Sequence, residues 1–377
     1  MKVLIATDSF KESLTSLQAA TAMETGIKKV FPNSEIIKVP MADGGEGTVQ
    51  ALIDATGGEL IKTMVISPLG EKVKGFFGVS GDKQIAFIEM AAASGLALIP
   101  VEERNPCLTT SYGTGELIKE ALDQGVKKII LGLGGSGTND GGVGMLQALG
   151  AQCVDKVGKD ILPGGEHLLD LAHISLKSLD PRLQNVQIDV ACDVDNPLCG
   201  PNGASAIFGP QKGATATMVQ TLDEALLNFA DIVEQDLGIK IQDVSGAGAA
   251  GGMGAGLLIL PKVRLESGVD IVIEATGLIE KAKDVDVVIT GEGQMDAQTI
   301  YGKTPIGVAK TAKKWSKPVI AIVGSVKEDY GVVYDYGIDA VFPSIRQVTD
   351  IQTVLKHAEQ NLISCAQNVA KLYQITP

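Results

Sequence analysis

The stretch KIILGLGGSGTNDGGVGMLQALG, residues 128–150, decides how the rest of the chain is interpreted. An apolar run from Ile129 to Leu133 leads into a loop that is half glycine, and a helical pattern opens at about Val143. A strand, a glycine loop and a helix start bring backbone N–H groups and the positive end of the helix dipole to one point, which favours a phosphate group. Asn139 and Asp140 add the oxygen ligands that Mg2+ prefers. The stretch therefore predicts a phosphate site with a metal ion beside it.

Two other interpretations of this loop stay open. The first is a tight structural turn with no ligand. The second is a dinucleotide fingerprint, because Gly132, Gly134 and Gly137 fit GxGxxG and Asp155 lies about where a ribose-binding acid is expected. That fingerprint needs a helix at once, whereas further glycines at 141, 142 and 144 delay the helix here.

Composition limits the class of protein. A chain of 377 residues predicts two domains, and 45 glycines with only 4% aromatics favour an α/β enzyme over a binding module with aromatic anchors. A net charge of −13 argues against a nucleic-acid-binding surface. We find no apolar run of about 18 residues and no signal peptide, so we expect no membrane span and a cytoplasmic location. Five cysteines without a CxxC predict neither a disulfide framework nor a zinc site.

The pattern of expected elements differs between the ends and the middle of the chain. Strands alternate with helices at both ends: strands at 2–7, 36–39, 287–290, 318–323 and 340–342, helices at 16–30, 49–55, 306–314 and 352–372. Between them, 60–66, 72–79 and 85–90 form a meander. We therefore predict an α/β fold of two domains, with the active site in the cleft between them. Residues 1–64 plus 268–377 form a Rossmann-like parallel βα domain, and residues 65–267 form an inserted mixed α/β domain.

Carboxylates recur among glycines and lysines recur among glycines or at helix starts: Asp8, Asp43, Glu46, Asp140, Asp193, Glu292, Asp296, Lys11, Lys212 and Lys303. The three histidines lie outside these motifs and no GxSxG elbow occurs, which argues against histidine-based hydrolysis and zinc catalysis. Phosphoryl transfer remains, because it needs phosphate cradles, metal-binding carboxylates, cations and one base near the accepting hydroxyl. Spacing alone does not say which aspartate is the base.

Several long blocks, in order along essentially the whole chain, resemble the bacterial type I glycerate kinases: DSFKESL, PMADGGEGT, EMAAASGL, TTSYGTGEL, GLGGSGTNDGG, CDVDNPLCGPNGA, FGPQKGA, GAGAAGGMGA and ITGEGQMDAQT. The resemblance implies ATP- and Mg2+-dependent phosphorylation of D-glycerate, with 2-phosphoglycerate as the usual bacterial product. It also implies a two-domain α/β fold with a cleft lined by these blocks. Gly137 stands where alanine is common in this family, and Tyr112 and Gln294 stand where arginine is frequent.

On this basis we assign hypothetical roles. The catalytic residues are Asp193, Asp43, Lys11 and Asp296, and the metal ligands are Asp140 and Asp193. The ATP phosphates are held by Gly134, Gly135, Ser136, Gly137, Thr138 and Lys212. The substrate is bound by Asp8, Ser9, Glu46, Glu292 and Gln298. The rival functions are another small hydroxy-acid or sugar kinase, an NAD-dependent dehydrogenase and a metabolite-sensing regulator. We expect a monomer or a homodimer.

Overall fold

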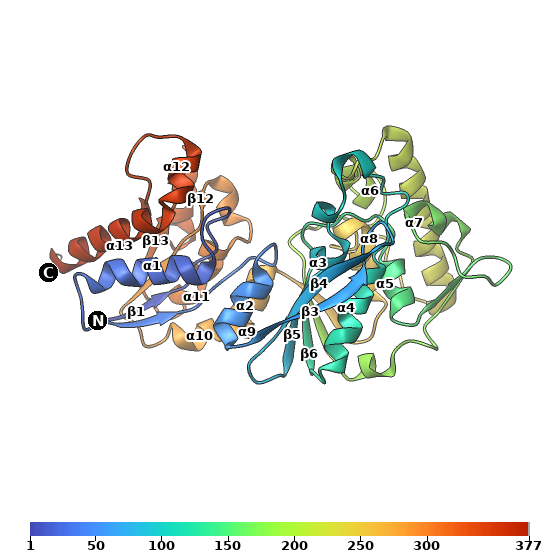
Figure 1. Ribbon diagram of the computed structural model, residues 1–377, viewed down its shortest axis with the longest axis horizontal. Coiled ribbons are helices and arrows are strands. Elements are labelled where there is room, and N and C mark those ends of the chain that lie inside the picture. Colours follow the sequence, from blue (N-terminus) through green and yellow to red (C-terminus); the bar gives the residue numbers. More distant parts are fainter. Residues whose placement is uncertain (376–377) are drawn as a thin grey trace. The chain divides into compact units, whose positions relative to one another are not determined.

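The computed structural model describes residues 1–375 and has the α/β architecture that the sequence predicts (Figure 1). The chain divides into two compact units. The first unit comprises Met1–Asp43, Gln50–Gly57 and Ser267–Pro377, and the second comprises Gly44–Val49 and Gly58–Glu266. Both ends of the chain therefore build one unit, and the middle builds the other.

The first unit is built on a five-stranded sheet in the order β15-β13-β11-β1-β2, and all its strands are parallel. Its strands are β1 (Lys2–Ile5), β2 (Glu35–Lys38), β11 (Val287–Thr290), β13 (Val319–Val323) and β15 (Ala340–Pro343). This is the flavodoxin-like order of a doubly wound sheet. The prediction of a Rossmann-like parallel sheet from both chain ends is confirmed.

Helices cover both faces of this sheet. On one face, α1 (Ser16–Lys28) and α13 (Ala358–Ile375) pack over inward-facing residues such as Val3 and Ile289. Gly26 permits the close approach of these helices, because a Cβ atom there would overlap the carbonyl oxygen of Ile363. The helix α11 (Thr304–Lys313) packs against β11 and β13, and α9 (Gly268–Thr276) packs against α11. Residues at the carboxyl ends of the strands are thereby left at an open edge.

The second unit holds a mixed six-stranded sheet in the order β10-β9-β6-β5-β4-β3. The strands β3 (Glu59–Ile66), β4 (Lys72–Val79) and β5 (Ile85–Glu89) form the antiparallel meander that the sequence predicts. The strands β5, β6 (Lys128–Gly132), β9 (Gln187–Ala191) and β10 (Val263–Glu266) are parallel. The strand β10 was not predicted.

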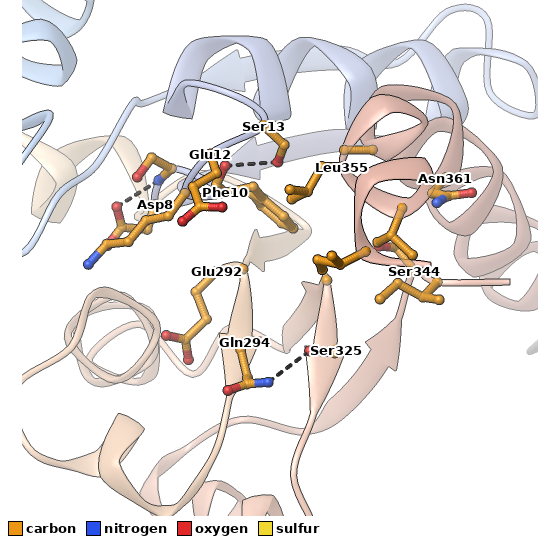
Figure 2. Close-up of a pocket in the computed structure, with 18 of the residues that line it drawn as sticks. Asp8, Phe10, Glu12, Ser13, Glu292, Gln294, Ser325, Ser344, Leu355 and Asn361 are labelled. Atoms are coloured by element: carbon orange, nitrogen blue, oxygen red, sulfur yellow. Dashed lines mark hydrogen bonds between the residues drawn. The ribbon is translucent and has the colours of Figure 1, made fainter. Parts of the chain in front are cut away.

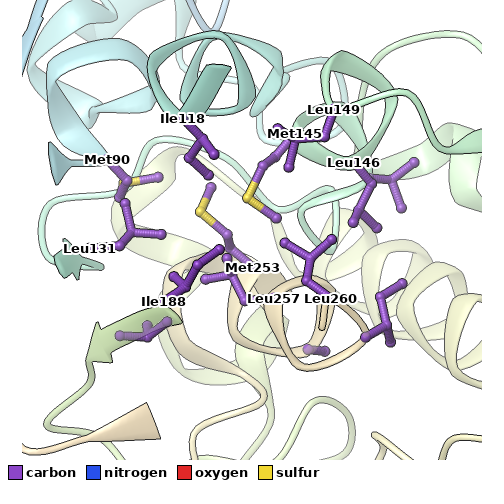
Figure 3. Close-up of a cluster of buried hydrophobic side chains, with 14 of the residues drawn as sticks. Met90, Ile118, Leu131, Met145, Leu146, Leu149, Ile188, Met253, Leu257 and Leu260 are labelled. Carbon is purple, nitrogen blue, oxygen red and sulfur yellow. The ribbon is translucent and has the colours of Figure 1, made fainter. Parts of the chain in front are cut away.

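The core of the second unit lies between the sheet and the helices α4 (Tyr112–Asp123), α5 (Val143–Ala148), α7 (Ala216–Leu237) and α8 (Ala249–Leu258). Figure 3 shows Met145, Met253 and Leu257 gathered with Ile118 and Leu131 in this core. The helix α8 begins inside the glycine-rich stretch 246–256, with left-handed backbone at residues 250–252.

The remaining elements are short. They are α2 (Thr48–Thr56), α3 (Ala91–Ser94), α6 (Ala204–Phe208), α10 (Leu278–Lys281), α12 (Ile351–Lys356), β7 (Gln152–Val154), β8 (His173–Ser175), β12 (Gln294–Met295) and β14 (Ser325–Val326). The expected C-terminal helix is thus two helices, which are separated at His357. Within residues 1–375, no helix is long and apolar enough to cross a membrane.

Candidate active site

A pocket of about 440 Å³ opens at the carboxyl edge of the first unit's parallel sheet (Figure 2). Asp8 follows β1 and Glu292 follows β11, and these two strands are neighbours in the sheet. From β1 the chain continues to one side of the sheet, and from β11 it continues to the other side. Ligands of open α/β sheets bind at such a switch point, outside the carboxyl ends of the strands.

Asp8 is held in a fixed orientation at this point. Its carboxylate accepts hydrogen bonds from the backbone N–H of Ser9 at 2.6 Å and from Thr304 Oγ1 at 2.7 Å. Burial, and then the neighbouring Asp43 carboxylate, raises the pKa of Asp8 to about 6, although the Lys11 ammonium acts in the opposite direction. Asp8 therefore changes its charge close to neutral pH.

Glu292 is the second titratable group of the pocket. It is 7% exposed and accepts a hydrogen bond from Thr299 Oγ1 at 2.7 Å. The Lys303 ammonium lies 3.7 Å from its carboxylate. Burial raises the pKa of Glu292 to about 7, against the effects of Thr299 and Lys303. A buried carboxylate that can take a proton near pH 7 suits a general base.

Asp296 differs from both of these carboxylates. It forms an ion pair with Lys327 at 2.7 Å and lies 3.5 Å from the Lys303 ammonium. The hydrogen bond from Lys327 lowers the pKa of Asp296, so this carboxylate stays ionised. It also accepts a hydrogen bond from the Gln298 backbone N–H at 3.0 Å. Asp296 is thus suited to orienting cations and less suited to removing a proton.

The pocket brings together seven of the residues that we singled out from the sequence: Asp8, Ser9, Lys11, Asp43, Glu292, Asp296 and Lys303. Gln298 is exposed and does not line it. Glu46, Asp193, Asp140, Lys212 and the loop 134–138 belong to the second unit.

In the second unit, the glycine loop after β6 offers free backbone donors at one end. Gly134 and Gly135 are exposed, and Gly135 has a left-handed φ of 75°. Within residues 1–375, the N–H groups of Gly134, Gly135 and Ser136 donate no hydrogen bond. Three consecutive unpaired amides match the backbone cradles that bind anions.

Lys212 lies beneath this loop. It is only 1% exposed, and its ammonium donates to Ser136 Oγ at 2.8 Å and to the carbonyl oxygen of Thr138 at 2.6 Å. Burial lowers the pKa of Lys212 to about 7. We predicted a direct contact with ATP phosphates, but these bonds make Lys212 a support that holds the loop from the inside.

The other end of the loop is packed against the protein. The Gly137 N–H donates to the Ser94 carbonyl oxygen, and a Cβ on Gly137 would come within 2.7 Å of Ile99 Cδ1. A Cβ on Gly251 would overlap the carbonyl oxygen of Thr138, so the stretch 246–256 lies directly on the loop backbone. The interpretation as a structural turn therefore holds for this half of the loop, including Gly137 and Thr138.

Asp140 does not fit a metal site. Its carboxylate is 2% exposed and accepts hydrogen bonds from Ser111 N and Oγ, both at 2.8 Å, and from the N–H groups of Gly142 and Gly144. These donors leave the carboxylate enclosed by its own chain. Asp193 is exposed in the loop after β9 and fits Mg2+ better, because Mg2+ is commonly held by one or two carboxylates plus phosphates. Among residues 1–375, no group of three or more His, Cys, Asp or Glu could hold a metal ion.

A comparison with protein-family models matches residues 3–374 to the glycerate kinase family. The chain belongs to the glycerate kinase family. A glycerate kinase of Haemophilus influenzae is 65% identical over 99% of this chain and 98% of its own length. The glycerate 2-kinase of Escherichia coli is 52% identical over 98% of this chain and 97% of its own length.

Solved structures agree with this assignment. A crystal structure from Salmonella typhimurium LT2, described as a glycerate kinase 2, superposes with a TM-score of 0.93 at 51% identity, over 99% of this chain and 98% of that one. The resemblance found in the sequence is thereby confirmed, and this member of the glycerate kinase family is a kinase.

The dinucleotide interpretation is not supported in this glycerate kinase family member. The helix α5 begins only at Val143. The fingerprint needs a helix that opens within the glycine motif, by about Gly137. The Asp155 carboxylate accepts hydrogen bonds from Val157 and Lys159 N–H groups at 2.9 Å each, which close a tight turn. It is therefore committed to local structure and is not a ribose ligand.

Sequence reasoning missed several residues of both units. Thr304 and Lys327 were given no role from the sequence, but they orient Asp8 and Asp296 from other parts of the chain. Arg104 is one of four arginines, and its guanidinium has no acceptor within residues 1–375. Its backbone lies against Gly213, next to Lys212. The rarity of arginine in this acidic chain was the one available signal.

Proposed function

We propose that this protein transfers the terminal phosphoryl group of ATP to the 2-hydroxyl of D-glycerate. ATP and D-glycerate give ADP, 2-phosphoglycerate and a proton. The observation that carries the proposal is the pair of carboxylates at the carboxyl edge of the sheet, the half-buried Asp8 and the buried Glu292, with pKa values raised to about 6 and 7. Membership of the glycerate kinase family supplies the reaction class.

Glu292 is the group best suited to accept the proton of the attacking hydroxyl. A base of this kind contributes roughly 10²–10⁴-fold to the rate. Asp43 lies beside Asp8 and stays a proposed catalytic residue, whereas the ion pair of Asp296 with Lys327 makes it a weaker base. In our proposal Asp296 orients Lys303, and Lys303 counters the charge that develops on the substrate.

The other residues predicted from the sequence are assigned to the substrate, to the ATP phosphates or to support of the glycine loop. Lys11 and the Ser9 hydroxyl would bind the anionic substrate from the segment after β1. The free N–H groups of Gly134, Gly135 and Ser136 would bind ATP phosphates. Gly137, Thr138 and Lys212 would keep that loop in shape and would not touch the nucleotide. Glu46 and Gln298 are retained only as proposed substrate contacts.

Mg2+ completes the proposal, with Asp193 as the carboxylate that would hold it. The ion would neutralise the negative charge of the transferring phosphoryl group. Asp140 is withdrawn as a metal ligand, because its buried carboxylate already accepts four hydrogen bonds from its own chain. The cytoplasmic location and the monomeric or homodimeric state stay predictions.

The experiment that tests the function measures ADP release with a panel of small hydroxy acids and sugars, with and without Mg2+. We expect turnover with D-glycerate and Mg2+. In the proton-coupled phosphorus NMR spectrum, a product phosphorylated at C2 gives a doublet, because one proton is attached there, whereas a C3 product gives a triplet. A triplet would overturn the assigned hydroxyl. Much faster turnover of another acceptor would overturn the substrate.

A further inference from the structure

The pocket of the first unit has two chemically different ends (Figure 2). What we call its acidic end contains the charged residues Asp8, Lys11, Asp43, Glu292, Asp296 and Lys303. What we call its apolar end contains Ile345, Ile351, Val354, Leu355 and Ala358. In Figure 2, Asp8 and Glu292 lie on one side of the pocket, and Leu355, Ser344 and Asn361 lie on the other.

D-glycerate accounts for only the acidic end. It is a three-carbon acid that carries an oxygen on every carbon, so it gains nothing from an aliphatic wall. The cavity of about 440 Å³ lies in the range of sites for drug-sized or nucleotide-sized ligands. Removing apolar surface from contact with water is favourable, which favours occupation of this end by a flat, weakly polar group.

Two polar side chains at the apolar end, Asn361 and Ser344, can form hydrogen bonds with such a group. Asn361 is buried, and its Oδ1 accepts a hydrogen bond from Arg346 Nε at 3.2 Å. That bond fixes the amide orientation, so the Nδ2 donor is directed away from Arg346. Within residues 1–375 neither Asn361 Nδ2 nor Ser344 Oγ has a hydrogen-bond partner. The pocket therefore offers one amide donor and one hydroxyl to its ligand.

These features match a purine nucleoside. The ring nitrogens of adenine are acceptors for an amide N–H, and its exocyclic amine can donate to a hydroxyl. The faces of the ring suit aliphatic side chains such as Leu355 and Val354. The fold adds independent weight, because the pocket lies at the switch point between β1 and β11, where open α/β sheets bind nucleotides.

We infer that the apolar end of this pocket binds the adenine ring of ATP, with Asn361 and Ser344 reading its edge and Leu355 packing on its face. The inference rests on the proposed function for the identity of the nucleotide. It adds the part of the site that selects the base, which neither the glycine motifs nor the carboxylates supply. None of these residues belongs to a motif that we singled out in the sequence.

Two variants of the full chain test the inference. Leu355→Trp fills the apolar end, and we expect it to raise the Kd for ADP by roughly ten- to hundredfold, because the larger ring takes the space of the base. Asn361→Asp keeps the shape and the acceptor for Arg346 but replaces the donor by an acceptor. We expect this variant to lower the preference for ATP over GTP by roughly five- to tenfold. Leu227→Trp, on the partly exposed surface of α7 in the second unit, is the matched control.

The measurements are ADP binding by titration calorimetry without glycerate, and KM for ATP, GTP and glycerate. Circular dichroism confirms that each variant folds. If both folded variants bind ADP and discriminate between ATP and GTP as the parent does, the inference is overturned. A rise in KM for glycerate alone overturns it as well. If the parent chain binds ADP in this pocket but phosphorylates no acceptor, the proposed function fails and the nucleoside site stands.

Discussion

Replacing Lys212 by methionine is the perturbation whose size follows most directly from the structure. The amine is enclosed beneath the loop 134–138, and burial lowers its pKa from 10.5 to about 7. In the unfolded chain the amine is solvated and keeps its proton up to about pH 10.4. Between these values the unfolded state binds more protons than the folded state, so stability rises with pH.

The size of this stability change is the difference in protons bound to Lys212 between the unfolded and folded states, integrated over pH. From pH 7 to pH 8.5 the unfolded Lys212 stays protonated, whereas its protonated fraction in the folded chain falls from about one half to a few per cent. At 1.36 kcal/mol per proton and pH unit, this difference stabilises the folded chain by about 1.6 kcal/mol over that interval. Lys212→Met removes the titration, so its unfolding free energy lacks this increase. The matched control is Lys240→Met, because the Lys240 side chain is 82% exposed.

The expected effect of Lys212→Met on ATP binding has a different origin from its effect on stability. Methionine leaves Ser136 Oγ and the Thr138 carbonyl oxygen without a buried donor, at about 1–3 kcal/mol for each unsatisfied group. The loop then loses the support that holds its free N–H groups in place. We expect KM for ATP to rise by roughly tenfold or more, with a smaller change in KM for glycerate.

The assay follows the lysine Cε resonances by NMR in chains labelled at that carbon, together with urea unfolding at pH 7 and pH 8.5. One resonance should titrate with a midpoint near pH 7 and be missing from Lys212→Met. If every lysine of the folded chain titrates above pH 9.5, the amine is solvated and the reasoning fails. Equal pH dependence of stability in the parent chain and in Lys212→Met would refute it independently.

Three further predictions concern separate features. Glu292→Gln should lower kcat at pH 7 by roughly 10²–10⁴-fold. In the parent chain, kcat/KM should rise through about pH 7 as Glu292 loses its proton. A parent chain that is fully active with a flat kcat/KM profile from pH 5.5 to 8.5 would contradict the assignment of Glu292 as the base. Gly251→Ala should destabilise the chain by about 3 kcal/mol or more in thermal unfolding, because it combines a left-handed φ of 69° with overlap on a backbone carbonyl oxygen. Gly238→Ala, with a φ of 72° and no atom within 4 Å, should cost only about 1–2 kcal/mol; equal losses would show that the backbone contact is not tight. Arg104→Met should raise KM for ATP by roughly tenfold through loss of an unpaired guanidinium, whereas Arg182→Met, whose guanidinium already pairs with an aspartate, should leave it unchanged.

Much of the fold was predictable because of the way parallel sheets are buried. Strands covered on both faces appear as continuous apolar runs, and β11 with the sequence VVIT is buried at every position. The strand β10, with the sequence VRLE, alternates apolar and charged residues and is half-buried throughout. It pairs only with β9 at the edge of its sheet, so its sequence carries a weaker signal. Edge position therefore explains why one strand was missed.

The acids of the site were predictable for a related reason. A carboxylate directly after a strand of a parallel sheet must lie at the carboxyl edge, so Asp8 and Glu292 could be grouped without a structure. Their orienting partners could not be found in this way. Thr304 lies 296 residues from Asp8 along the chain, and Lys327 lies 31 residues from Asp296. Such pairs depend on how helices and loops pack, which local sequence does not encode.

The glycine loop shows where sequence reasoning reaches its limit. A glycine that exposes its amide to a ligand and a glycine that admits a neighbouring backbone both lack a Cβ, so they are identical in sequence. Gly134 and Gly251 illustrate the two cases, since the first is exposed beside unpaired N–H groups and the second lies on the Thr138 carbonyl oxygen. The stretch 246–256 packs closely on the loop 134–142 because Gly251 and Gly256 lie against the carbonyl oxygens of Thr138 and Gly141, where a Cβ would overlap. The two glycine blocks are thus a matched pair, and the packed half fixes the position of the half that is free to bind phosphate.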